Sequence, residues 1–299
     1  EFSGLRVGRE VGGGIVYEPL KRPLTVYDLL RHTAGLTYGV FFRSPVKGLY
    51  LEAGVDRFDL SREVFLERLA ALPLRFQPGE TFEYGLATDL LGHLLEALAG
   101  RSLAELLEER LFRPLGMKDS GFQAKDPARL AQPFPKDPET GHSLRLLPVE
   151  TPPPRYAGGM GGVGTAADYL AFLEALRLGR GALSPTMAGF MVQDHLGSLY
   201  PEALKRGPEY LPGPGYSFGL GVAVRVEPMG YSPGALGEWT WAGFGGTFFF
   251  VDPLQEITAL YLAQAPNLLS VLEPEKALPA RRGAGRRPAL PPLVCLGLE

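Results

Sequence analysis

The stretch "ATDLLGHLLEALAGRSLAELLEER", residues 87–110, decides the fold class because it predicts two helices joined end to end. Gly100 is expected to end the first helix, and Ser102 with Glu105 forms a capping box that begins the second. The apolar positions of the first helix recur at helical spacing and predict one buried face: Leu91, Leu94, Leu95 and Leu98. A predominantly helical region is therefore expected here.

Outward from this stretch, further helix starts are predicted on both sides. Thr25 and Asp28 have the spacing of a capping box and predict a short helix over residues 25–30. Ser61 is a plausible N-cap for a helix in residues 59–74, and Thr165 caps another helix together with Asp168. The helical lobe is expected to extend from about residue 20 to about residue 200.

The pattern changes after Tyr216, where apolar and β-branched runs alternate with Gly and Pro turns. The runs that predict strands are "SFGLGVAVRV", "WTWAGFGG", "TFFFVDP" and "EITALYLAQ". Helices first and an antiparallel sheet later predict an α+β domain over residues 1–271, with its strands at about 216–265. Residues 272–299 lose all periodicity, and we expect a disordered linker or the product of a shifted reading frame.

Composition limits the classes of function. A net charge of −3 and a pI near 5.9 give no basic footprint for nucleic acid, and no apolar run is long enough to span a bilayer. The single cysteine, Cys295, and four scattered histidines predict neither a disulfide framework nor a metal site, and no cofactor is expected. The only asparagine is Asn267, which fits a heat-adapted source. The oligomeric state is left open, and so is the cellular location: the cytoplasm is favoured, but a lost N-terminus would hide a signal peptide.

Two stretches fit the Gly-x-Ser-x-Gly pattern of a nucleophile elbow. In "GYSPG", residues 230–234, the residue after Ser232 is Pro233, which has no N–H for an oxyanion. In "GYSFG", residues 215–219, Ser217 is followed by a predicted strand where the elbow requires a helix. A lipase of the α/β-hydrolase class is therefore the weaker reading of a serine hydrolase.

Five stretches, in order, resemble the serine β-lactamase and penicillin-binding-protein superfamily, and within it the family VIII carboxylesterases and class C β-lactamases. They are "LTVYDLLRHTAGL", the segment from "FQPGETFEYGL" through "PLGMKDSGF", "AGGMGGVGTAADYLAFLEAL", "GYSFGLGV" and "WAGFGGTFFFVDP". The resemblance covers about residues 17–265. It implies the β-lactamase/transpeptidase-like fold, with an antiparallel sheet and a mostly helical lobe.

The resemblance also implies site residues. Tyr84 of "FEYGL" stands where the family has its proton-relaying tyrosine, and a phenol needs a nearby cation to act as a base. Trp241 of "WAG" occupies the place of the strand lysine. Gly243 would let substrate approach the strand, and the N–H of Phe244 would be one oxyanion donor.

Two departures favour a neutral ester as substrate. Leu86 stands where class C β-lactamases carry an asparagine, so the amide of a β-lactam side chain loses its partner. Trp241 removes the cation that would pair with a β-lactam or peptide carboxylate. The expected function is therefore that of a carboxylesterase acting on small acyl esters through an acyl-enzyme.

The nucleophile is the gravest departure. The family's mechanism needs Ser-x-x-Lys at a helix start, and "SPVK", Ser44 to Lys47, follows the hallmark loop instead of preceding it. Gly48 is expected to interrupt any helix, which makes a surface loop the favoured reading. We therefore expect a fragment, incomplete at its N-terminus, that lacks the nucleophile and is inactive as given.

Two further readings stay open. A degenerate member would keep the cleft as a non-catalytic module that binds acyl groups or peptidoglycan, and a β-lactamase or D-Ala-D-Ala peptidase is the remaining enzymatic alternative. Upstream coding sequence containing Ser-x-x-Lys would favour an enzyme over the binding module.

Overall fold

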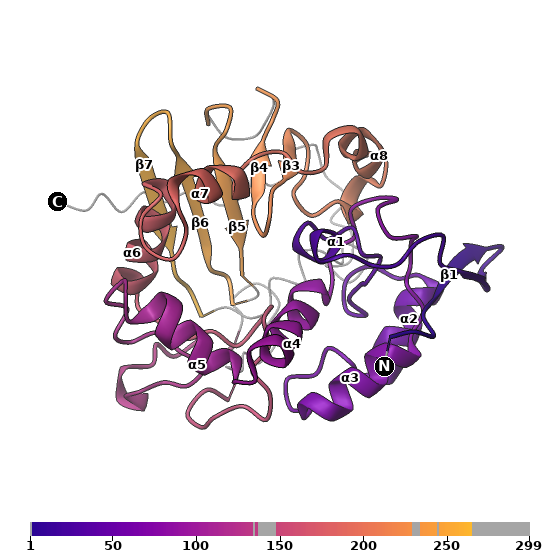
Figure 1. Cartoon of the computed structure of the whole chain (residues 1–299), viewed down its shortest axis with the longest axis horizontal. Coiled ribbons are helices and arrows are strands. Elements are labelled where there is room, and N and C mark those ends of the chain that lie inside the picture. The colour runs from indigo at the N-terminus through magenta and orange to yellow at the C-terminus, as the bar shows by residue number, and fades with distance from the viewer. Residues whose placement is uncertain (1, 134, 137–147, 229–233, 244, 265–299) are drawn as a thin grey trace.

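The computed structural model describes residues 2–133, 135–136, 148–228, 234–243 and 245–264, and Figure 1 shows their arrangement. The N-terminal hairpin consists of β1 (Arg6–Val11) and β2 (Gly14–Pro19). The helices are α1 (Val26–Leu30), α2 (Pro45–Ala53), α3 (Arg62–Ala71), α4 (Ala87–Ala99), α5 (Leu103–Leu107), α6 (Ala166–Arg177), α7 (Pro185–Met191) and α8 (Tyr200–Leu204). A π-helical turn (Glu108–Phe112) extends α5, and short 3-10 turns cover Pro127–Arg129, Gly197–Leu199 and Gly207–Glu209.

The predicted helix ends are confirmed where a side chain caps the backbone. Thr25 with Asp28 and Ser102 with Glu105 both form complete capping boxes, at α1 and α5. Gly100 ends α4 in the left-handed conformation, with φ of 65°, which glycine adopts at little cost. Ser61 and Thr165 accept hydrogen bonds from the third residue of α3 and α6, respectively.

Five antiparallel strands form the main sheet in the order β3 (Tyr216–Phe218), β4 (Ala223–Arg225), β5 (Trp239–Ala242), β6 (Phe248–Asp252) and β7 (Ile257–Tyr261). The predicted α+β class with an antiparallel sheet is confirmed. The run "SFGLGVAVRV" makes two short strands, because Gly221 turns the chain with φ of 97°.

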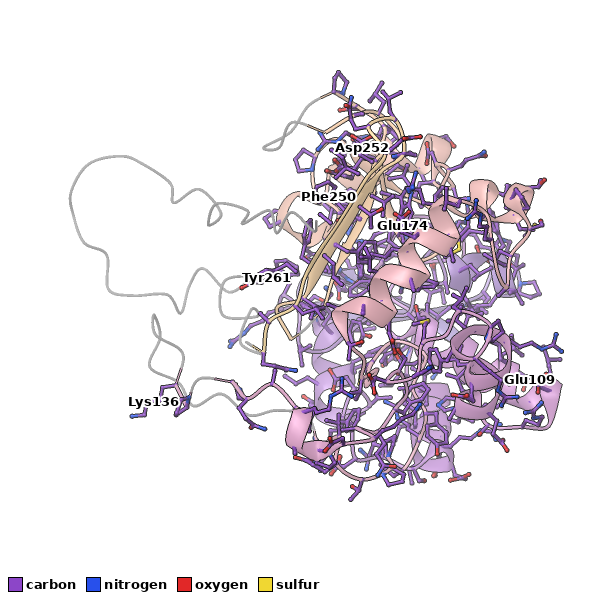
Figure 2. The ribbon with its side chains drawn as sticks, turned by 90° about the vertical axis from the view of Figure 1, so that its left-hand side faces the viewer. Glu109, Lys136, Glu174, Phe250, Asp252 and Tyr261 are labelled. Atoms are coloured by element: carbon purple, nitrogen blue, oxygen red, sulfur yellow. The ribbon has the colours of Figure 1, made fainter. Side chains whose placement is uncertain are left out.

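Helices α6 and α7 cover one face of this sheet (Figure 1). Leu173 and Leu176 of α6 pack against Phe249 and Val251 of β6, which point to the same face because strand side chains alternate. In Figure 2, Glu174 lies on the α6 side of the sheet, while Phe250 and Tyr261 lie on the other side. None of the described helices is long and apolar enough to cross a membrane.

Among the described residues, three apolar clusters fill the interior. The first joins the N-terminal hairpin to α1–α4, the second lies between α6, α7 and the sheet, and the third packs Phe82 against Phe218 and Tyr200. Tyr84 borders the first and third clusters, while Trp241 borders the second and third. The segments that carry these two residues therefore meet where the clusters adjoin.

The prediction of an apolar stripe on α4 is confirmed for Leu91, which is buried, but is wrong for Leu95 and Leu98. Leu95 and Leu98 are 48% and 77% exposed, whereas the buried face carries Asp89, His93 and Glu96. The buried charges are partnered: Arg155 Nη1 lies 3.0 Å from Asp89 Oδ1, and His93 Nδ1 lies 2.9 Å from Glu96 Oε2. Leucine spacing misplaced part of the buried face, because paired polar groups occupy positions there that the pattern assigned to leucine.

The prediction of a loop around "SPVK" is also wrong. Ser44 caps α2, and Pro45 occupies its first turn, where a missing N–H costs nothing. Gly48 lies inside the helix, which continues to Ala53. A glycine costs only about 1 kcal/mol in a helix interior, and Val46 and Tyr50 on the same helix are fully buried. Packing of α2 therefore outweighs the glycine.

Candidate active site

Tyr84 lies in a cluster of rings contributed by distant segments. Its ring centroid is 4.9 Å from that of His32, 5.1 Å from that of Trp241 and 5.4 Å from that of Tyr38, with Phe41 at 6.0 Å. The structure thus brings together two of the residues predicted from the sequence, Tyr84 and Trp241. We call residues 81–85 the loop side of this contact and Trp239–Ala242 the strand side.

The loop side is fixed by backbone contacts on either side of Tyr84. The N–H of Glu83 donates to the carbonyl oxygen of His32 at 2.8 Å. A Cβ at Gly85 would lie 2.4 Å from the Cα of Thr37 and 2.4 Å from the carbonyl oxygen of Leu36. Only glycine allows this close approach, so the loop docks directly on the segment that follows α1.

The ring cluster is uncharged at neutral pH. Burial raises the pKa of Tyr84, although a side-chain hydrogen bond with Trp241 acts in the opposite direction. Burial lowers the pKa of His32 to about 3, so its imidazole is neutral, and it raises the pKa of Tyr38 well above its usual value. A phenol in such surroundings is protonated and acts as a donor until a cation comes close.

The strand side holds Trp241 by register. Trp241 pairs with Phe249 of β6, and its ring meets the ring of Phe218 edge-on at 5.2 Å. Gly243 follows β5 in a tight turn, where its N–H donates to the carbonyl oxygen of Thr247 at 2.8 Å. A Cβ at Gly243 would lie 2.1 Å from Thr247 Oγ1, so a larger residue here would displace the Thr247 side chain. Phe244 lies outside the described residues.

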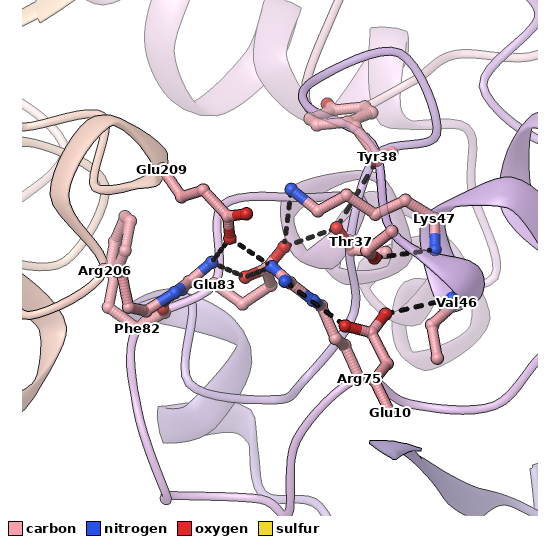
Figure 3. Close-up of polar contacts among 11 residues, drawn as sticks. Glu10, Thr37, Tyr38, Val46, Lys47, Arg75, Phe82, Glu83, Arg206 and Glu209 are labelled. Atoms are coloured by element: carbon pink, nitrogen blue, oxygen red, sulfur yellow. Dashed lines mark hydrogen bonds and ion pairs between the residues drawn. The ribbon is translucent and has the colours of Figure 1, made fainter. Parts of the chain in front are cut away.

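The Ser-x-x-Lys stretch is helical, but its two functional groups are engaged separately. Ser44 Oγ accepts a hydrogen bond from the backbone N–H of Lys47 at 3.4 Å. The Lys47 side chain is 3% exposed, and its Nζ lies 3.3 Å from Oε1 of Glu83. Figure 3 shows this amine directed to Glu83. The arrangement is that of a helix cap and a buried ion pair.

The elbow-like serines divide between a described and an undescribed segment. Ser217 is fully buried in β3, and its Oγ donates to Oδ1 of Asp194. Asp194 also accepts the backbone N–H groups of Leu196 and Gly197, at 2.9 and 3.0 Å, so the serine ties strand β3 to the turn that begins at Asp194. Ser232 and Pro233 lie outside the described residues.

A cleft of about 610 Å³ lies elsewhere, between α4, the start of α5 and residues 154–156. Its arginines are engaged in ion pairs, and Glu105 accepts hydrogen bonds from Ser102. Arg101 Nη1 lies 2.6 Å from Glu109, and Arg62 Nε lies 3.6 Å from Glu96. Tyr84 and Trp241 are not part of its lining. Within the described ranges, no three or more His, Cys, Asp or Glu side chains gather as metal ligands would.

Sequence reasoning missed the charged cluster directly beside Tyr84. The carboxylate of Glu83 is surrounded by Thr37, Lys47, Arg75 and Arg206, which come from four separate segments (Figure 3). The only local signal was the position of Glu83 next to the predicted tyrosine. Its partners lie between 8 and 123 residues away along the chain, and no periodicity connects them.

Comparison with known proteins gives a family and several relatives. The family model described as Beta-lactamase matches residues 16–278. Esterase EstB of Burkholderia gladioli is 34% identical over 266 residues, covering 82% of this chain and 65% of EstB. Lovastatin esterase of Penicillium rubens is 30% identical over 269 residues, covering 83% of this chain and 66% of that protein.

A solved structure supports the same assignment. EstCE1, described as a hydrolase with promiscuous acyltransferase activity, superposes with a TM-score of 0.67 at 31% identity. The match covers 86% of this chain and 70% of that chain. Against the two curated esterases, however, the chain spans less than two thirds of their length.

Proposed function

The chain belongs to the beta-lactamase family, and on this premise we propose that it carries the proton-transfer half of a carboxylesterase site for small acyl esters. The observation that carries the proposal is the contact of Tyr84 with Trp241 inside an uncharged ring cluster. The similarity to two esterases supports the reaction class.

The proposed reaction proceeds in two steps. A serine hydroxyl attacks the ester carbonyl, its proton passes through Tyr84 to the departing alcohol, and an acyl-enzyme remains; water then releases the acid, and the serine regains its proton. Because burial raises the pKa of Tyr84, its phenol needs an adjacent cation before it can accept a proton. We propose that the serine and its lysine lie outside residues 1–299, because Ser44 and Lys47 are already engaged as a cap and an ion pair.

The apolar strand side supports a neutral substrate. Trp241 has no charge to offer a carboxylate, and it packs on Tyr84 and Phe218. A β-lactam or a peptide ends in a carboxylate that would lose its water here without gaining a cation. An acyl ester suffers no such loss. We further propose that Gly243 and Phe244 border the place of the substrate carbonyl.

The test compares two substrate classes on two lengths of protein. The protein encoded by the complete reading frame should show a kcat/KM for p-nitrophenyl butyrate at least about 100-fold above that for a chromogenic cephalosporin. The 299-residue chain should show no ester turnover above background. Equal rates on ester and cephalosporin would contradict the esterase proposal.

A binding role is the second candidate, because the one Ser-x-x-Lys lysine forms an ion pair with Glu83. A non-catalytic module would bind a short acyl ester or a peptidoglycan fragment through the same ring cluster without consuming it. If the longer protein binds p-nitrophenyl butyrate but releases no nitrophenol, the binding role replaces the esterase proposal.

A further inference from the structure

The carboxylate of Glu83 is the centre of a buried charge cluster next to Tyr84. The Glu83 side chain is 1% exposed, and Thr37 Oγ1 and Lys47 Nζ both contact its Oε1, the latter at 3.3 Å. Arg75 Nη1 lies 3.1 Å from Oε2, and Arg206 Nη2 bonds the same oxygen. Figure 3 shows the four donors converging on one carboxylate.

The cluster is balanced in charge. Glu209 Oε2 lies 2.6 Å from Arg75 and 2.9 Å from Arg206, and Glu10 Oε2 lies 3.6 Å from Arg75. Lys47, Arg75 and Arg206 thus face three carboxylates. Leaving a buried cation without its partner is strongly destabilising. Any movement of the Glu83 carboxylate away from these donors is therefore unfavourable.

The cluster also connects the two sides of the Tyr84 contact. Arg206 donates hydrogen bonds to the side chain of Glu83 and to the carbonyl oxygen of Phe82, so it contacts two consecutive residues of the loop side. Arg206 and Glu209 precede Tyr210, whose hydroxyl donates to the carbonyl oxygen of Tyr216 in β3 at 2.7 Å. The same segment therefore contacts the loop that carries Tyr84 and the sheet that carries Trp241.

We infer that Glu83 is a positioning residue that holds the ring of Tyr84 at its centroid distance of 5.1 Å from the ring of Trp241. Charge pairing fixes the residue before Tyr84, and the close packing of Gly85 fixes the residue after it. Glu83 touches no reacting atom, and its effect on catalysis rests on the proposed function. Its effect on the Tyr84–Trp241 contact does not.

The primary test is spectroscopic and needs no activity. The 299-residue chain labelled with 5-fluorotryptophan contains two reporters, Trp239 and Trp241, and the variant Trp239→Phe assigns them by ¹⁹F NMR. Glu83→Gln should shift or split the Trp241 resonance and leave that of Trp239 unchanged. Glu96→Gln is the matched control, because Glu96 is also buried and bonded but belongs to α4; it should move neither resonance.

A second variant separates positioning from simple charge balance. Glu83→Gln combined with Lys47→Met removes one charge of each sign, so it should restore much of the thermal stability lost in Glu83→Gln. The positioning role requires that the Trp241 resonance stay displaced in this double variant. If the wild-type resonance returns, or if Glu83→Gln never displaces it, the inference is wrong.

Kinetics on the protein encoded by the complete reading frame supply the catalytic readout. Glu83→Gln should lower kcat for p-nitrophenyl butyrate by about 10- to 100-fold, because small misplacements of a catalytic group cost this much, with KM nearly unchanged. If Glu83→Gln leaves kcat unchanged but displaces the Trp241 resonance, then Glu83 positions Tyr84 without affecting catalysis, and only the catalytic part of the inference is wrong. A wild-type protein without ester turnover would remove the proposed function and leave the NMR test intact.

Discussion

The loop side and the strand side of the Tyr84–Trp241 contact are built by different forces. On the loop side, Glu83 is held by ion pairs and hydrogen bonds to residues that lie between 8 and 123 positions away in the sequence. On the strand side, Trp241 is held by β-sheet register and by apolar packing against Phe218. The Tyr84–Trp241 contact therefore depends on ion pairing on the loop side and on close packing on the strand side.

The two sides should therefore respond to different perturbations. Ion pairs respond to pH, because their carboxylates can be protonated. Apolar packing responds to volume, because a cavity costs both burial and contacts. Perturbations that change only one of these quantities should therefore separate the two sides.

The largest effect is expected from a cavity on the strand side. Trp239 is 1% exposed and meets the ring of Phe249 edge-on at 5.9 Å. Trp239→Ala should lower the free energy of unfolding by about 3–5 kcal/mol, with the same loss at low and high salt, as measured by urea denaturation. Trp239→Phe, which keeps a ring, should lose clearly less. A loss that depends on salt would contradict the packing account.

The next effect concerns chemistry rather than stability. Tyr84→Phe keeps the ring in contact with His32 and Trp241 but removes the hydroxyl. In a protein that contains this chain and hydrolyses p-nitrophenyl butyrate, kcat should fall about 100-fold or more, the usual scale of acid–base help. The urea midpoint should change little. Retained turnover would mean that another group carries the proton.

The smallest effect is a pH dependence on the loop side. Burial alone would raise the pKa of Glu209, but hydrogen bonds from Arg75 and Arg206 outweigh it and lower the pKa to about 2. The stabilisation from this carboxylate is therefore complete above its ordinary pKa of 4.5 and is lost as the pH falls from 4.5 towards 2.

Glu209→Gln should make the free energy of unfolding less dependent on pH in that window, by at most about 1.4 kcal/mol per pH unit. Urea denaturation at pH 3, 4, 5 and 7 measures the slope. Glu202→Gln is a suitable control, because its carboxylate pairs with Lys205 on the surface. If the free energy of unfolding changes with pH equally in wild type and Glu209→Gln, then Glu209 has the same pKa in the folded and unfolded states, and the prediction is wrong.

Much of the fold could be predicted from the sequence, because it depends on interactions between residues that are close together along the chain. Capping boxes at Thr25 and Ser102 act over three residues, and Gly100 ends a helix through its own φ. Alternating strands after Tyr216 and the motifs around Tyr84 and Trp241 were sufficient for the fold class and the family. The roles of these two residues in catalysis remain predictions.

The sequence alone thus determined the capped starts of α1, α3, α5 and α6, the α+β class, and which tyrosine and tryptophan to examine. Three features became visible only in the tertiary structure. Helix α2 continues through Gly48, and α4 buries Asp89 while Leu95 is exposed. Lys47 forms a buried ion pair with Glu83. The physical reason is the separation along the chain between the residues that interact. A cap is satisfied within one turn, whereas Glu83 is satisfied by side chains as far away as Arg206, and burial of a charge is decided only when all its partners have come together.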